Sequence, residues 1–170
     1  MSDVEERTTR LIAECRRQEE SCLYTSTSLY IWLRRSRLWQ RVFIIAPIIL
    51  GGLATWSVID QPETKWLAGT CALLAGFFPA IYEALKLDVH MDEIARHAAV
   101  FKNLQDRFRQ LALVTALGSF DDFQAGFEQL MKQMEQARTS SLTPPERCFK
   151  KAQGKIQSGH YSFAVDEGTK

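Results

Sequence analysis

The chain has 170 residues, a formal net charge of +1 and 46% hydrophobic residues. This near-neutral balance lacks the basic excess typical of nucleic-acid binding, so we expect no nucleic-acid partner. Polarity is distributed in blocks, because residues 42–85 are almost uncharged whereas residues 1–41 and 86–170 are polar. The first forty residues contain no apolar run, so we expect no cleavable signal peptide.

The first block, residues 1–41, is predicted to be a cytoplasmic N-terminal helix. Residues 3–40 contain neither proline nor glycine, and they fit one long helix or two. Their apolar residues approximate a single thin stripe that is interrupted by charged and hydroxyl side chains. We therefore expect this helix to pack on another part of the protein.

Two apolar segments follow, residues 42–59 without an ionisable group and residues 66–85 with Glu83 alone. A bilayer core of roughly 30 Å needs about twenty helical residues, so each segment predicts a transmembrane helix. The second is richer in glycine, threonine and proline, and we expect it to insert together with the first. In a soluble bundle both helices would need cover on every side, which the remaining polar segments are too few to provide.

The connection at residues 60–65 is a short turn that contains Pro62. So short a turn makes the two helices antiparallel neighbours and places both termini on the same side. The cationic residues lie before the first segment and directly after the second: Arg34, Arg35, Arg37, Arg41 and Lys86. The positive-inside rule then predicts an inner-membrane protein whose termini are both cytoplasmic.

The second apolar segment carries small residues at every fourth position, which are Ala68, Ala72, Gly76, Ala80 and Ala84. Such a row allows another helix to approach closely. It either seals the hairpin within one chain or packs hairpins into an oligomer around a pore. Pro79 and Glu83 are a candidate hinge and a candidate lumen group. A tolerated membrane proline and a carboxylate that reaches headgroup water are the simpler interpretations.

Residues 86–138 predict a cytoplasmic helical region. The second membrane helix shows no breaker before Leu117, so we expect it to continue to that residue, and Gly118 to end it. A coiled-coil-like seam with a spacing of seven is the candidate assembly surface, and it consists of Leu87, Ile94, Phe101 and Phe108.

Ser119 and Asp122 resemble a helix N-cap box, which opens a further amphipathic helix that ends near Arg138. These helices are expected to form a small bundle. Residues 139–170 are predicted to be a flexible tail, within which residues 146–157 form one short basic helix.

Catalytic motifs are absent from the sequence, which has no glycine-rich phosphate loop, no GxSxG and no HExxH. His90, Glu93 and His97 are helically spaced, but no fourth metal ligand accompanies them, and an exposed helix surface is the simpler interpretation. The four cysteines form no CxxC pattern and are expected to be reduced. We expect no enzyme activity, no cofactor and no metal.

The run YTSTSLYIWLRRSRLWQRVFIIAPIILGGLATW, with a long charged helix before it and a short turn and second span after it, resembles the SLATT family. The resemblance covers roughly residues 5–135. It implies a two-transmembrane effector of bacterial nucleotide-signalling conflict systems. Such an effector oligomerises and perforates the membrane when a separate cytoplasmic sensor, encoded nearby, is triggered.

The sequence therefore predicts an all-α membrane protein, a transmembrane hairpin with cytoplasmic helical extensions that form a small bundle. Its partners would be the lipid bilayer and further copies of itself, and its function that of a pore-forming or membrane-disrupting effector of antiphage defence. A nonconducting membrane anchor that recruits a cytoplasmic partner is the alternative. A conventional small ion channel is disfavoured, because the turn carries no selectivity motif.

Overall fold

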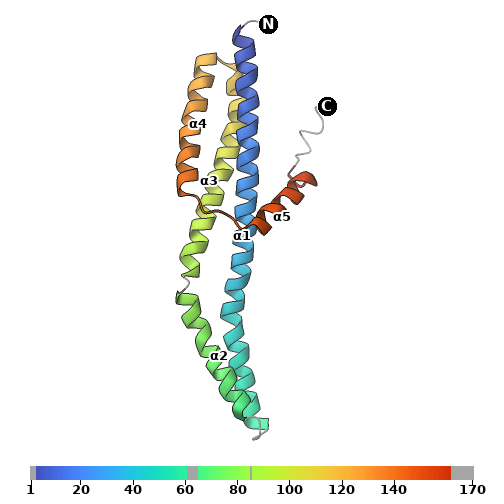
Figure 1. The fold of residues 1–170 in the computed structure, drawn as a ribbon, viewed down its shortest axis with the longest axis vertical. Coiled ribbons are helices and arrows are strands. Elements are labelled where there is room, and N and C mark those ends of the chain that lie inside the picture. Colours follow the sequence, from blue (N-terminus) through green and yellow to red (C-terminus); the bar gives the residue numbers. More distant parts are fainter. Residues whose placement is uncertain (1–2, 61–64, 85, 162–170) are drawn as a thin grey trace. The chain divides into compact units, whose positions relative to one another are not determined.

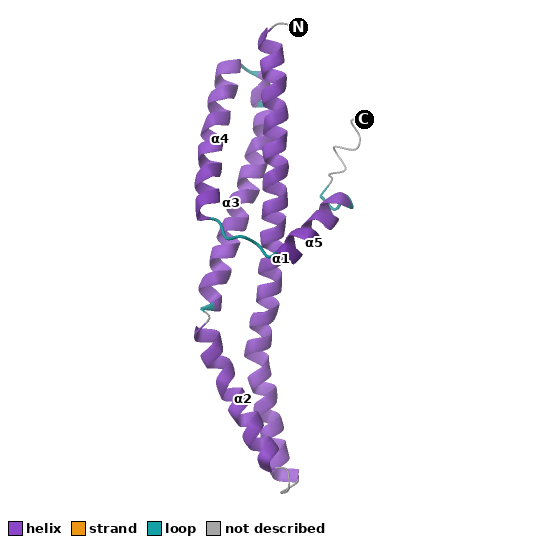
Figure 2. Ribbon diagram, in the orientation of Figure 1, coloured by secondary structure: helices purple, strands orange, loops and turns teal. Residues whose placement is uncertain are grey.

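The structure is a computed structural model that describes residues 3–60, 65–84 and 86–161, without the side chains of residues 57–60, 65, 67, 87 and 88. Every regular element in these residues is helical (Figures 1 and 2). In chain order they are α1 (Asp3–Asp60), α2 (Lys65–Ala84), α3 (Leu87–Leu113), the 3-10 turn η2 (Thr115–Leu117), α4 (Phe120–Ser140) and α5 (Glu146–Gln157).

The helices divide into two compact units. The bundle unit contains residues 1–32 and 94–170, and the hairpin unit contains residues 33–93. Helix α1 contributes its first part to the bundle unit and its remainder to the hairpin unit. It is one element of 58 residues that continues through Pro47. A proline inside a helix removes one backbone hydrogen bond, a loss that membrane helices commonly tolerate.

Helix α1 is long and apolar enough to cross a membrane, and none of its most apolar 18-residue window is buried. The segments Ala68–Ala84 and Val89–Leu117 reach the same criterion only as a pair. The described residues therefore contain one clear membrane-span candidate.

The expected continuous helix from Trp66 to Leu117 is wrong. Helix α2 ends at Ala84, and α3 begins at Leu87. Lys86 between them has a φ of 45°, in the left-handed region that interrupts an α-helix. At its other end α3 stops at Leu113, and η2 leads to Gly118.

The bundle unit is built from amphipathic helices that bury their apolar faces against one another. Its fully covered side chains include Leu29, Phe101, Phe108 and Phe123. The predicted N-cap of α4 is confirmed, since Ser119 Oγ accepts a hydrogen bond from the Asp122 backbone N–H at 3.2 Å. A single core thus holds together segments that lie far apart in the sequence.

The predicted short basic helix at residues 146–157 is also confirmed as α5. It follows the linker after Ser140 and lies beside α1 (Figure 1). The Phe149 and Tyr24 rings approach with centroids 6.1 Å apart, and Cys148 and Ala152 are buried. The segment predicted as a flexible tail therefore contains a helix that packs on the bundle, whereas residues 162–170 lie outside the described part.

Candidate functional site

The hairpin unit is held together by a seam between α1 and α2. Partly or fully covered residues recur at intervals of three and four on both helices: Gln40, Phe43, Pro47, Leu50 and Ala54 on α1, and Ala68, Cys71, Ala75, Phe78 and Tyr82 on α2. This spacing places each set on one face of its helix, as in a left-handed helix pair.

Two contacts fix the register of that seam. The Phe43 and Phe78 rings meet edge to face, with centroids 5.6 Å apart. Gln40 Nε2 donates a hydrogen bond to Tyr82 Oη at 2.9 Å, and this polar pair is of the kind that joins helices inside bilayers. Both partners would be costly to leave unpaired in an apolar medium.

The row of small residues lies mostly outside this seam. Ala68 is buried, but Ala72, Gly76, Ala80 and Ala84 are exposed. A Cβ added to Gly76 would meet no atom within 4 Å. Because a spacing of four drifts around a helix, the row begins at the seam and then turns away from it. The chain's own α1 therefore covers one end of the row and leaves the rest open.

The candidate hinge and lumen residues lie toward the end of α2. Pro79 is inside the helix and exposed, and the Glu83 side chain is exposed as well. The Glu83 backbone carbonyl accepts a hydrogen bond from the Lys86 N–H at 3.1 Å, which tightens the end of the helix. The strong interruption of the backbone is thus at Lys86, seven residues after the proline.

The predicted cytoplasmic assembly residues are found inside the bundle. Ile94 and Phe108 are 0% exposed and Phe101 is 2% exposed, whereas the side chain of Leu87 lies outside the described part. The Phe108 ring meets the Phe127 ring of α4 at a centroid distance of 6.2 Å. The described residues of this seam are therefore core contacts within one chain and do not form an open assembly surface.

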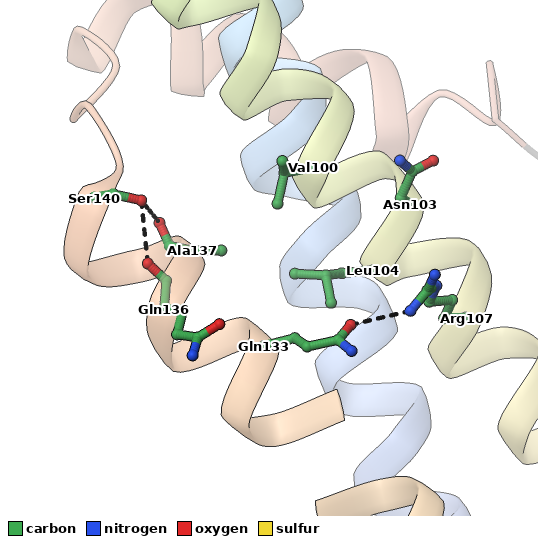
Figure 3. A pocket seen from close by; sticks show the side chains of 8 residues that line it. All are labelled: Val100, Asn103, Leu104, Arg107, Gln133, Gln136, Ala137 and Ser140. Carbon is green, nitrogen blue, oxygen red and sulfur yellow. Dashed lines mark hydrogen bonds between the residues drawn. The ribbon is translucent and has the colours of Figure 1, made fainter. Parts of the chain in front are cut away.

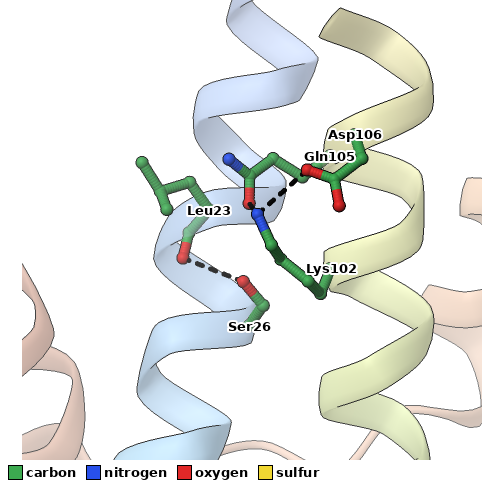
Figure 4. Close-up of polar contacts among 5 residues, drawn as sticks. All are labelled: Leu23, Ser26, Lys102, Gln105 and Asp106. Atoms are coloured by element: carbon green, nitrogen blue, oxygen red, sulfur yellow. Dashed lines mark hydrogen bonds and ion pairs between the residues drawn. The ribbon is translucent and has the colours of Figure 1, made fainter. Parts of the chain in front are cut away.

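The contact between α1 and α3 also contains a polar layer, which sequence reasoning missed. Ser26 and Gln105 are 2% and 6% exposed. Lys102 Nζ donates to Gln105 Oε1 at 3.0 Å and lies 2.9 Å from Asp106 Oδ1. On α1, Ser26 Oγ donates to the Leu23 carbonyl at 3.2 Å. Figure 4 marks these contacts with dashed lines. Small hydroxyl residues satisfy their own helix in this way and let the neighbouring helix approach closely.

Glu19 belongs to the same side of the bundle. Partial burial raises the pKa of its carboxyl group above the ordinary value, and the cations of Arg109, Arg16 and Lys102 offset this effect only in part. A raised pKa means that the folded bundle favours the neutral carboxyl group. Protonation of Glu19 therefore favours the folded bundle.

A shallow groove of about 380 Å³ lies between α3 and α4 (Figure 3). Arg107 Nη1 donates to Gln133 Oε1 at 3.1 Å across it, and Asn103, Gln136 and Ser140 add further polar atoms. The lining holds one cation and several amides but no Asp, Glu, His or Cys. The groove therefore offers hydrogen bonds without a general acid or base.

The cysteines are free and buried: Cys15, Cys22, Cys71 and Cys148. Burial raises the pKa of Cys15 and of Cys22 to about 11, so both thiols stay protonated at neutral pH. Within the part of the chain that the structure describes, no three His, Cys, Asp or Glu residues are grouped to hold a metal ion. His97 is itself buried, whereas His90 is partly covered.

In comparisons with protein-family models, curated proteins and solved structures, nothing matches this chain. The arrangement of its own residues therefore carries the functional argument. The features that stand out are an uncovered apolar segment of α1, an open row of small residues on α2, and a bundle with a packed core.

Proposed function

We propose that the chain is a membrane effector whose hairpin inserts as two antiparallel spans and associates laterally with the hairpins of other copies, perforating the bilayer. Both termini and the bundle would lie on the cytoplasmic side. The resemblance to the SLATT family agrees with this proposal. It also suggests the biological role that we propose, which is bacterial antiphage defence.

Membrane insertion is supported by the apolar surface of α1. Ile44, Ile48, Leu53 and Trp56 are all more than half exposed. Each fully buried aliphatic side chain contributes about 1.5–3 kcal/mol relative to one left in water. A bilayer would cover all of these side chains at once, and it would also cover Leu73 and Phe77 of α2.

Lateral association is supported by one observation above all: the open part of the small-residue row. Transmembrane helices gain little from apolar contact as such, because lipid tails are equally apolar, so they associate through close backbone packing. Ala72, Gly76 and Ala80 offer such a surface, and α1 of the same chain leaves it uncovered. A second hairpin packed there would extend the seam into a larger assembly.

The other candidate function is a nonconducting membrane anchor that recruits a cytoplasmic partner. The polar groove between α3 and α4 favours it, because its amides and Arg107 lie open on the bundle. Both functions require insertion, but only the effector requires the bilayer to become permeable. A nucleotide-signalling protein encoded nearby would be the expected trigger of the effector and the expected ligand of the scaffold.

The test is uptake of a membrane-impermeant dye by bacteria that overproduce the protein. Ala72→Leu combined with Gly76→Leu adds bulk to the open row and should abolish uptake. Thr70→Leu combined with Phe77→Leu is the matched control, because it places leucines on the exposed face of α2 away from the row and should preserve uptake. Alkaline extraction of membranes would confirm equal insertion and expression.

Dye uptake with the wild type and the control, but not with the row variant, is the expected result. If wild-type protein that is inserted in the membrane to the same extent as the variants admits no dye, the anchor function replaces the effector function. Uptake that is equal in all three proteins would show that permeability does not depend on packing at the row.

A further inference from the structure

The groove between α3 and α4 combines buried apolar residues with open polar ones (Figure 3). Leu104 and Ala137 line it and are 3% and 6% exposed. Its polar lining consists of Asn103, Arg107, Gln133, Gln136 and Ser140. The volume of about 380 Å³ is comparable with that of ligand sites, which range from about 300 to 1,000 Å³ and likewise place a few polar groups on an apolar lining.

Arg107 carries a positive charge that the groove itself does not neutralise. Its Nη1 donates to Gln133 Oε1 at 3.1 Å, and this hydrogen bond positions the guanidinium between α3 and α4. Arg107 forms no ion pair with another residue in the described part of the chain, and no carboxylate lines the groove. A guanidinium has five N–H donors, so several remain for a ligand. The charge therefore favours an anionic ligand, and a carboxylate matches the guanidinium in a bidentate pair.

The amide side chains narrow the choice of anion. Each Asn or Gln side chain offers both a donor and an acceptor, whereas a free carboxylate or phosphate presents acceptors alone. A polypeptide main chain presents one donor and one acceptor in nearly every residue, so it can use both halves of each amide. Asn103 and Gln136 are exposed on opposite sides of the groove and are open to such a partner.

The spacing along α4 fits an extended segment. Gln133, Gln136 and Ser140 are separated by three and four residues, so they form one row on the same side of the helix. Neighbours in such a row are about 5–6 Å apart. In an extended chain, residues that point the same way repeat at about 6.6 Å, which is close enough for consecutive contacts.

We propose that this groove binds an extended acidic segment of another protein. A carboxylate of that segment pairs with Arg107, and its main chain forms hydrogen bonds with the amides of Asn103 and Gln136. The inference goes beyond the proposed function, because the groove lies wholly within the bundle unit and binding there requires neither membrane insertion nor a permeable bilayer.

The experiment uses the full chain in a neutral detergent and measures the fluorescence anisotropy of a labelled peptide. The acidic probe is an acetylated peptide of alternating alanine and glutamate, and the neutral probe has glutamine in place of each glutamate. The acidic probe should bind about tenfold more tightly, because a hydrogen bond between charged groups adds at least that factor. High salt should reduce the difference, since the Debye length falls from about 10 Å at 0.1 M to about 3 Å at 1 M.

Two variants separate the charged contact from the amide contact. Arg107→Gln should weaken the acidic probe about tenfold and leave the neutral probe unchanged. Arg96→Gln is the matched control, because it removes the same charge from an exposed position of α3 outside the groove, and it should bind both probes like the wild type. Gln136→Leu removes an amide and should weaken both probes. All three positions are exposed, so urea unfolding should show nearly unchanged stability.

Equal affinity for the two probes would overturn the proposal, and so would the same loss of affinity in Arg107→Gln and Arg96→Gln. Unchanged binding by Gln136→Leu would also contradict it, because the contact would then be ionic alone. If free glutamate or inorganic phosphate displaces the acidic probe as effectively as the unlabelled peptide does, the groove binds a small anion and the proposal is wrong. Dye uptake by cells tests the proposed function separately, so a failure of either one is recognised by itself.

Discussion

Substitution of Phe108 tests the reassignment of the predicted assembly seam to the bundle core. Its side chain is 0% exposed and meets the Phe127 ring at 6.2 Å, so Phe108→Ala removes a full ring from a packed site. Buried Phe→Ala changes cost about 3–5 kcal/mol because transfer free energy is lost and a cavity remains. This is a large fraction of the 5–15 kcal/mol that is typical of a domain.

The buried thiols of Cys15, Cys22 and Cys148 provide an assay specific to the bundle. They react with a maleimide only when the bundle opens, because their side chains are 0–2% exposed. A loss of 3–5 kcal/mol should raise the rate of alkylation by about two to three and a half orders of magnitude. Val114→Ala, at a residue that is 61% exposed, is the control and should leave the rate nearly unchanged.

The reasoning is refuted by a Phe108→Ala protein whose thiols remain as protected as in the wild type while its oligomer dissociates. That outcome would restore Phe108 to an interface between chains. Faster alkylation without any change in the oligomer is the result that the packed core predicts.

Three further predictions use urea unfolding of the full chain in detergent as the measurement. Lys86→Gly should raise the free energy of unfolding by up to about 1 kcal/mol, because glycine adopts a φ of 45° without strain, and an unchanged or lower value would argue against strain there. Glu19→Gln should be more stable than the wild type at neutral pH. Because the pKa of Glu19 is raised in the folded state, the stabilisation by its protonated carboxyl group is complete below about pH 4.5 and is lost as the pH rises through the folded-state pKa. The difference in the free energy of unfolding between this variant and the wild type should therefore vanish in acid. Gly126→Ala should change the free energy of unfolding by less than about 1 kcal/mol, because the gain of about 1 kcal/mol in helix propensity offsets the shift of Leu111 Cδ1, which would lie 2.8 Å from the new Cβ; a loss of about 2 kcal/mol or more would mean that Leu111 cannot move aside.

Local rules were sufficient for part of the fold. Ser119 was predicted as an N-cap because its hydroxyl precedes an amphipathic run, and the structure forms that hydrogen bond. Helix α5 was likewise predicted between Pro145 and the glycine-containing segment after Gln157. These features could be predicted because they depend on residues that are close together in the sequence.

The break after α2 could not be predicted in the same way. Lys86 is neither glycine nor proline, and nothing in its neighbourhood signals a left-handed residue. By contrast, the helix predicted over residues 42–59 is continuous through Pro47. The backbone conformation at Lys86 therefore departs from what its local sequence prefers.

The sequence also did not show what covers each apolar helix face. A spacing of seven correctly marked Ile94, Phe101 and Phe108 as a seam, but periodicity does not say whether the same chain or another copy covers it. The small-residue row was equally ambiguous. Its drift around α2, which leaves Ala72 and Gly76 open, emerges only once the seam through Cys71 and Phe78 is known.

The most direct test of the central claim, a membrane hairpin with both termini inside, is labelling of intact cells with a membrane-impermeant maleimide. Gln61→Cys places a thiol in the turn predicted between the spans, and Gln153→Cys places one on α5. We predict that the reagent labels Gln61→Cys from outside and labels Gln153→Cys only after the cells are permeabilised. Labelling of Gln153→Cys in intact cells, or protection of Gln61→Cys until permeabilisation, would contradict the hairpin.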